Sequence, residues 1–305
     1  MHIPTPLLDS LQLGSLVPPR IWLKMDALQP AGSFKIRGIG HACQHYVSEG
    51  ASRLLASSAG NAGLAVAYAG RKLKVAVTVV VPTTTKPRAI ELIEQEGAEV
   101  IVAGEDWDAA DAHAHALKKP DWAFIHPFDD PLLWQGHSTI IDELVADGVT
   151  PDGIVVAVGG GGLMAGVVEG LRRHHWQDCP ILAVETPGTD SLYSAWQAGQ
   201  HISIEHITSI ATSLGARKVA AHSFELLTTH PIECHRVTDS QAVDACYHFL
   251  RDHRVMVEPA CGAALATVYE QAEFFQGKEN VVLIVCGGVG VTLERLAQWR
   301  QQLSD

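Results

Sequence analysis

Four consecutive glycines at 159–162 form a turn that could bind an anionic group. They follow an apolar run at 154–158, typical of a buried strand, and a helical segment begins at Leu163. Because glycine has no side chain, the backbone N–H groups can approach a ligand closely, and a helix N-terminus favours negative charge. The absence of a following Lys-Ser or Lys-Thr pair excludes a P-loop. The pattern predicts a phosphate-binding loop.

The same stretch matches a second pattern, G-x-G-x-x-A, which binds dinucleotides. It runs from Gly160 to Ala165, and the next expected strand ends at the acidic Glu185. Four adjacent glycines differ from the usual spaced pattern, and the chain shows no evident partner for hydride transfer. An NAD-binding oxidoreductase is therefore the less favoured interpretation.

A second strand-to-helix junction carries Ser57, Ser58, Ala59, Gly60 and Asn61. Serine and asparagine at a helix start are most often simple N-caps. The hydroxyls and N–H groups of such a turn can also bind a carboxylate. Together with the glycine turn, this junction favours a ligand system that carries both a phosphate and a carboxylate.

Lys35 and Cys286 could supply chemistry to such a ligand. Lys35 follows Phe34 at the start of a helical segment. A lone lysine is usually a solvated surface residue, but a lysine amine that forms a Schiff base is how proteins hold an aldehyde cofactor. Cys286 ends the apolar run at 281–285, where α/β sheets place ligand-contacting residues, although a buried thiol is structural by default.

These junctions are positioned by an alternation of β-branched runs and amphipathic helical segments, which is typical of parallel sheets covered by helices. We expect strands at 21–26, 53–57, 75–81, 99–103, 123–127, 153–158, 181–185, 234–237 and 281–285. We expect helices between them, for example at 61–72, 87–96, 131–145, 163–175, 240–252 and 262–275. The predicted fold class is α/β, with mostly parallel sheets.

Composition excludes several function classes. The chain has 305 residues, 47% of them hydrophobic, and a net charge of −12 without a basic cluster, which argues against nucleic-acid and anionic-membrane partners. No secretory signal and no apolar run of membrane-spanning length is visible. The six cysteines form no C-x-x-C pair and favour reduced thiols in the cytoplasm. His41 and His45 have helical spacing, but no third metal ligand is evident.

With these residues in view, the chain closely resembles the fold-type II pyridoxal-phosphate enzymes. Within them it resembles the serine/threonine dehydratases, above all the catabolic L-serine dehydratases of the liver type. The motifs that carry the resemblance cover nearly the whole chain and lie at 23–26, 30–40, 57–63, 126–131, 159–163, 257–264 and 285–288.

The resemblance implies a role for each candidate residue. Lys35 would be the Schiff-base lysine, and Phe34 would pack on the cofactor ring. Asn61 would hydrogen-bond the phenolic oxygen of pyridoxal 5'-phosphate, and the thiol of Cys286 would face its pyridine nitrogen. The phosphate would bind Gly159, Gly160, Gly161 and Gly162, and the substrate carboxylate would bind Ser58, Ala59, Gly60 and Asn61.

The family also implies a monovalent cation, K⁺, beside the phosphate loop. Its expected ligands are the Glu185 carboxylate and the carbonyls of Gly159, Thr189, Leu214 and Ala216. Two departures from the liver-type pattern are Val289-Gly290, in place of Ser-Asn, and Ser213, in place of a small apolar residue. We expect these to affect substrate preference or cofactor affinity rather than reaction class.

The implied activity is elimination of water from L-serine to give pyruvate and ammonia, and from L-threonine to give 2-oxobutanoate. Related serine racemases carry a serine where this chain has Ala59, so racemisation is expected to be weak. The alternatives are a β-replacement enzyme of the cysteine-synthase type and a cofactor-binding protein without activity, and the latter is disfavoured by Lys35. The chain stops soon after a last expected helix at 293–303, so control by isoleucine through an additional domain is not expected.

The resemblance further implies the tryptophan-synthase-β-like arrangement of two open, twisted sheets. A large cofactor-binding domain would comprise 1–35 and 131–305, and a small domain at 36–130 would be inserted in it, with the active site in the cleft between them. The expected assembly is a cytoplasmic homodimer.

Overall fold

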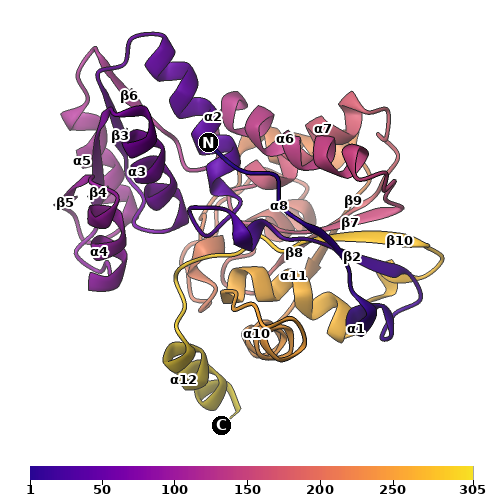
Figure 1. Cartoon of the computed structure of the whole chain (residues 1–305). Coiled ribbons are helices and arrows are strands. Elements are labelled where there is room, and N and C mark those ends of the chain that lie inside the picture. The colour runs from indigo at the N-terminus through magenta and orange to yellow at the C-terminus, as the bar shows by residue number, and fades with distance from the viewer. Residues whose placement is uncertain (305) are drawn as a thin grey trace.

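The computed structural model describes residues 1–304 and arranges them around two sheets flanked by helices (Figure 1). The predicted fold class is therefore confirmed. The larger sheet has the order β1 (Leu7–Asp9), β2 (Arg20–Lys24), β10 (Asn280–Ile284), β7 (Gly153–Ala157), β8 (Ile181–Glu185) and β9 (Ile232–Arg236). The smaller sheet has the order β5 (Glu99–Val102), β4 (Ala76–Val81), β3 (Arg53–Ala56) and β6 (Trp122–Phe124).

All neighbouring strands are parallel except the edge pair of β1 and β2. Parallel strands need crossover connections, and helices supply them. The helices of the described residues, in chain order, are α1 (Leu11–Gly14), α2 (Lys35–Ser48), α3 (Asn61–Leu73), α4 (Pro87–Gln95), α5 (Trp107–Leu117), α6 (Pro131–Ala146), α7 (Gly162–Arg173), α8 (Ser191–Ala198), α9 (Ala221–Thr229), α10 (Asp239–His253), α11 (Pro259–Tyr269) and α12 (Leu293–Ser304), and α2 to α11 lie between parallel strands.

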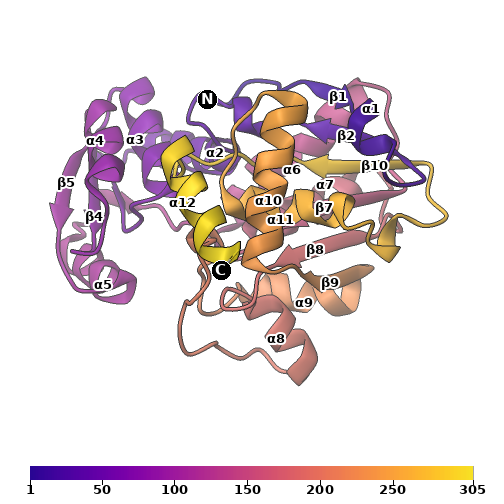
Figure 2. The ribbon, with the colours of Figure 1, turned by 90° about the horizontal axis from the view of Figure 1, so that it is seen from below.

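Helices cover both faces of the larger sheet. In Figure 1, α6 and α7 lie on one face, and α10 and α11 lie on the other. Strands β7 and β8 are therefore buried along their whole length, which explains their near-continuous apolar sequences. Figure 2 shows the smaller sheet with its helices at one end of the molecule and the larger sheet at the other.

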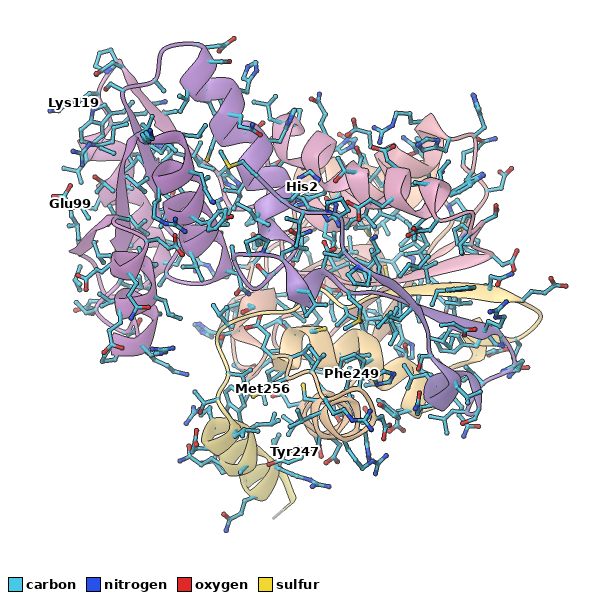
Figure 3. The ribbon with its side chains drawn as sticks, in the orientation of Figure 1. His2, Glu99, Lys119, Tyr247, Phe249 and Met256 are labelled. Carbon is cyan, nitrogen blue, oxygen red and sulfur yellow. The ribbon has the colours of Figure 1, made fainter. Side chains whose placement is uncertain are left out.

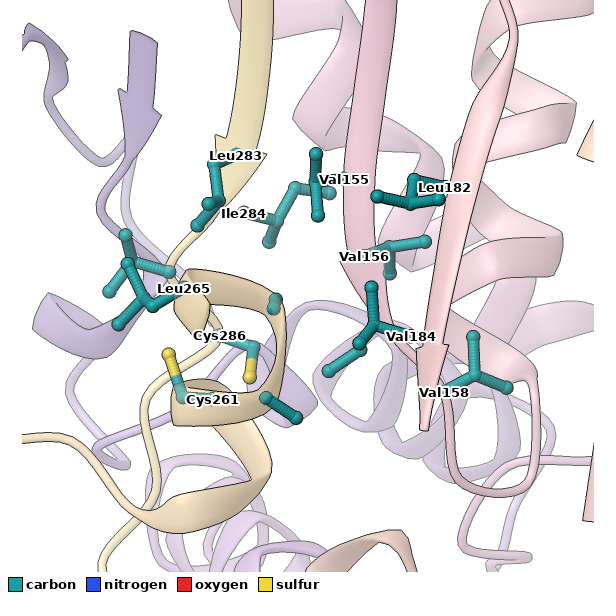
Figure 4. Close-up of a cluster of buried hydrophobic side chains, with 14 of the residues drawn as sticks. Val155, Val156, Val158, Leu182, Val184, Cys261, Leu265, Leu283, Ile284 and Cys286 are labelled. Carbon is teal, nitrogen blue, oxygen red and sulfur yellow. The ribbon is translucent and has the colours of Figure 1, made fainter. Parts of the chain in front are cut away.

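The main hydrophobic core lies on both faces of the larger sheet, against α6 and α7 on one side and α10 and α11 on the other. Figure 4 shows part of this core, with Val155, Val184 and Ile284 on the strands and Leu265 on α11, and each of these side chains is fully buried. Charged side chains of the smaller sheet region, such as Glu99 and Lys119, point outward (Figure 3). Among the described residues, no helix combines the length and apolarity needed to cross a membrane.

One expected helix is shorter than its sequence pattern indicates. The pattern over 262–275 predicts a single helix, but α11 ends at Tyr269 and a short 3-10 turn follows at Glu273–Phe275. The backbone turns at Gln271, whose φ is +54°, and the N–H of Ala272 donates to the carbonyl of Thr267. This left-handed C-terminal cap stops the helix although apolar residues continue.

Candidate active site

A cavity lies where β7 and β10 of the larger sheet end. Parallel strands place their carboxyl ends at one edge, and loops from that edge commonly bind ligands. Most of the candidate residues from the sequence line this one cavity, namely Phe34, Lys35, Asn61, Gly159, Gly160, Gly161, Gly162 and Cys286.

The segments of Lys35 and Cys286 lie side by side although they are far apart in the sequence. The N–H of Phe34 donates to the carbonyl of Cys286 at 3.0 Å, and Ser33 pairs with Gly287 in an isolated β-bridge. Gly287 has φ +87°, a conformation that favours glycine. These contacts place the lysine amine and the thiol in the same cavity.

Lys35 is the first residue of α2, and its amine is buried. The amine donates to the carbonyl of Pro127 at 2.6 Å and lies 5.2 Å from the centre of the Phe34 ring. Burial lowers the pKa of Lys35 to about 8, although the nearby Cys286 and Glu258 act in the opposite direction. A substantial share of this amine is therefore neutral near pH 8, as a nucleophile or base requires.

The glycine turn between β7 and α7 is built as an anion cradle. Gly161 caps α7 with φ +90°, and a side chain at Gly160 would lie 2.1 Å from the Phe128 ring. Within the described part of the chain, the N–H groups of Gly160 to Leu163 donate to no protein acceptor. The Ser223 hydroxyl lies beside Gly161, and it too is buried without a partner among the described residues. This set of free donors fits a phosphate.

The Ser57-to-Asn61 turn borders a second cavity of about 240 Å³. Ala59, Gly60 and Asn61 line it, whereas Ser58 does not. The hydroxyl of Ser58 instead accepts from the N–H of Gly60 at 3.4 Å, and that of Ser57 donates to Asp111 at 2.5 Å. The two cavities share Asn61, Ser213 and Glu258, so the turn adjoins the cavity that contains Lys35.

Cys286 is a buried, neutral thiol. Its neighbour Cys261 and burial hold the pKa of Cys286 well above the ordinary value, and the two sulfur atoms lie close together in Figure 4. Both cysteines are free thiols, as are the other four. A thiol in this state can offer a weak hydrogen bond to a ring nitrogen, but not the negative charge of a carboxylate.

The predicted cation ligands lie around the ends of β7 and β8. Glu185 is buried, and its carboxylate accepts the N–H groups of Leu192 at 2.9 Å and Tyr193 at 2.7 Å. Burial raises the pKa of Glu185 to about 8. Gly159 packs directly against the backbone of Leu214.

Three of the four predicted carbonyl ligands have uncommitted oxygen atoms. In the part of the chain that the structure describes, the carbonyls of Gly159, Thr189 and Ala216 accept no hydrogen bond, whereas that of Leu214 accepts the N–H of Ala216 at 2.8 Å. A buried carboxylate and uncommitted carbonyls are oxygen ligands of the kind that hard cations prefer.

Three residues of the site were not singled out from the sequence. Glu258 and Phe128 lie within motifs that carried the family resemblance, but the sequence assigned them no role. Ser223, in the first turn of α9, has no local sequence signal because only the fold brings it to the glycine turn. Glu258 precedes a proline and an apolar helix, which indicates a helix start and not a cavity.

Comparison with known proteins agrees with this geometry. Residues 1–287 match the family described as pyridoxal-phosphate dependent enzyme. The chain is 45% identical to a mouse protein named L-serine dehydratase/L-threonine deaminase, over 99% of this chain and 96% of that protein. It is 43% identical to the L-serine dehydratase of Dictyostelium discoideum, over 99% and 93% of the two chains.

A solved structure is also similar over its full length. The fungal L-serine ammonia-lyase from Rhizomucor miehei superposes with a TM-score of 0.93 and 36% identity, covering 99% of this chain and 98% of that one. The buried lysine, the phosphate cradle and these matches lead to one conclusion. The chain belongs to the family of pyridoxal-phosphate dependent enzymes.

Proposed function

We propose that the protein is an ammonia-lyase that eliminates water from L-serine to give pyruvate and ammonia, and that it also accepts L-threonine. The buried Lys35 amine, facing a cavity with a phosphate cradle, is the observation that carries this proposal. The named activity of relatives that are 43–45% identical over 99% of the chain supports the substrate class. A match of this extent favours a dehydratase over the β-replacement alternative.

The residues of the cavity would divide the work of binding pyridoxal phosphate. The free N–H groups of the glycine turn and the hydroxyl of Ser223 would hold its phosphate, and Phe34 would pack on its ring. Asn61 would donate to its phenolic oxygen, and Cys286 would face its ring nitrogen. When bound, this cofactor supplies an electron sink for the bond that breaks at the substrate Cα.

Lys35 would move the proton. Its amine must be neutral to accept the Cα proton, and burial provides this state near pH 8. The carbonyl of Pro127 accepts a hydrogen bond from the Lys35 amine and so fixes the orientation of the amine. The turn at 58–61 would orient the substrate carboxylate from the side of Ala59, Gly60 and Asn61, which line the cavity.

Two positions would restrict the outcome to elimination. The neutral thiol of Cys286 stabilises a charged ring nitrogen poorly, so transamination is slow. Ala59 has no hydroxyl with which to reprotonate the opposite face of Cα, so racemisation is slow.

The two sheets support a division into a large domain (1–35 and 131–305) and a small domain (36–130), with the active site between them.

A potassium ion beside Glu185 would neutralise a buried carboxylate and order the glycine turn. We also propose a cytoplasmic homodimer, and six free thiols suit a reducing compartment.

Release of 2-oxo acid from L-serine and L-threonine, measured separately with purified cofactor-saturated protein, tests the function. We expect pyruvate from L-serine at the higher kcat/KM, faster in K⁺ than in Li⁺, with D-serine formed far more slowly. A higher kcat/KM for threonine would contradict the ranking of substrates. Absence of 2-oxo acid from both substrates would overturn the proposal and direct the search to β-replacement donors.

Capture of the cofactor by the apo-protein should accelerate as the pH rises through about 8. Only the neutral Lys35 amine attacks the aldehyde, and burial lowers the pKa of this amine, whereas an exposed lysine titrates near 10.4. The measurement is the initial rate of growth of the visible absorbance, with Lys35→Ala protein as the blank. A rate that still rises steeply above pH ~9.5 would contradict a depressed pKa.

A further inference from the structure

Glu258 is a buried carboxylate in the cofactor cavity for which the reaction above has no use. It precedes α11, with Pro259 at the first helical position, but its side chain makes no capping bond to that helix. Only 4% of the residue is exposed. Burying a carboxylate costs free energy unless the carboxylate is hydrogen-bonded, so the hydrogen-bond partners of Glu258 indicate its role.

The hydrogen-bond partners of Glu258 come from three other segments, and one of them is the side chain of Ser213. One carboxylate oxygen accepts from the side-chain nitrogen of Asn61 at 2.8 Å, and the other accepts the N–H of Gly290 at 3.1 Å. A side chain at Gly288, whose φ is +123°, would lie 1.9 Å from the carboxyl carbon. The chain at 287–290 therefore passes directly over Glu258, and Asn61 reaches it from the first turn of α3.

These contacts fix the orientation of the Asn61 amide. The N–H of Val289 donates to the Asn61 oxygen at 3.1 Å, so that oxygen faces the C-terminal segment. Glu258 accepts one of the two hydrogen bonds that the Asn61 nitrogen can donate. An amide nitrogen carries two hydrogens, so one donor remains, and Asn61 lines the same cavity as Lys35.

We propose that Glu258 is a positioning residue that holds the Asn61 amide with its remaining N–H toward the phenolic oxygen of the cofactor. The same two bonds join α3, beside the smaller sheet, to the segment that follows β10 of the larger sheet. This inference rests on the proposed cofactor contact of Asn61, but it does not depend on which amino acid is the substrate.

The loss of Glu258 has a spectroscopic consequence. Without the Glu258 carboxylate, the Asn61 amide can rotate and turn its oxygen toward the cofactor. An amide oxygen repels an ionised phenolic oxygen, whereas an N–H donor favours the ionised form. The ionised form of the lysine-linked cofactor absorbs visible light, and the form with a protonated phenolic oxygen absorbs in the near ultraviolet. The balance between the two bands therefore reports the orientation of Asn61.

The test compares Glu258→Ala, Glu258→Gln and a control on the same helix, Thr267→Val. Thr267 is buried in α11, and its hydroxyl donates only to the carbonyl of Ala264, so its loss affects stability without reaching the cavity. We expect Glu258→Ala to bind the cofactor about tenfold or more weakly and to move absorbance from the visible to the near-ultraviolet band. Glu258→Gln keeps an oxygen for Asn61 and should restore most of both values.

The control should lose thermal stability with unchanged absorbance and cofactor affinity. Wild-type absorbance and affinity in Glu258→Ala, or an equal change in Thr267→Val, would overturn the proposal. If Glu258→Ala does not fold, Glu258→Asp gives the readout, because its shorter side chain draws the carboxylate away from the Asn61 nitrogen, and an unchanged spectrum there would also overturn the proposal. These measurements need no substrate, so they remain decisive even if neither serine nor threonine is turned over.

Discussion

Replacing Lys35 with alanine is expected to abolish 2-oxo acid release, with a loss of about 10⁴-fold or more, and to remove the visible absorbance of the lysine-linked cofactor. The cavity offers no second amine, because Lys35 is its only lysine among the described lining residues. The two readouts should disappear together, since the same nitrogen holds the cofactor and moves the proton. The measurements are a 2-oxo acid assay and an absorbance spectrum after dialysis.

A matched control is Lys119→Ala, which removes an exposed lysine that lines neither cavity and points outward (Figure 3). It should keep the activity and spectrum of the wild type. Full activity in Lys35→Ala would remove the core of the proposed function. Retention of the visible band in that variant would show that another lysine holds the cofactor.

The second large effect is on stability and concerns Arg37, two residues beyond Lys35. Arg37 is fully buried, and its guanidinium donates to both carboxylate oxygens of Asp26, at 2.7 and 2.8 Å. It also donates to Glu143 on α6 at 2.6 and 2.8 Å, and Lys24 contacts the same carboxylate at 2.6 Å. These ion pairs fasten the first turn of α2, and with it Lys35, to the larger sheet and to α6.

Arg37→Met is expected to lower the free energy of unfolding by about 3–5 kcal/mol, because it leaves the fully buried Asp26 without its cation. Urea unfolding monitored by circular dichroism measures the change. The control is Arg53→Met, which breaks a partly exposed pair with Glu99 and should cost less than about 1 kcal/mol.

A double variant tests the reason for the loss. Adding Asp26→Asn to Arg37→Met removes the uncompensated charge and should recover part of the stability. A loss below about 1 kcal/mol in Arg37→Met would show that the network contributes little. Equal losses in the single and double variants would show that packing, not charge, explains the effect.

Local sequence determined the elements and the type of chemistry. The apolar run before glycines 159–162 and the helix after them could be recognised because a buried parallel strand and a helix N-terminus leave local patterns. The lysine after Phe34 and the turn before α3 were recognised for the same reason. Their joint occurrence predicts a ligand system with a phosphate, a carboxylate and a lysine-bound aldehyde, and the family resemblance identifies it as that of a pyridoxal-phosphate enzyme.

Only the tertiary structure decided which residues meet. Asn61 and Glu258 are separated by 197 residues, and Arg37 and Glu143 by 106, so no periodicity relates them. Ser223 reaches the glycine turn because α9 packs beside α7, and Ser58 turns out to border neither cavity. Hydrogen bonds and ion pairs act over a few ångströms in space, whereas local propensities act over a few residues in sequence, so the sequence determined the elements and the fold determined their partners.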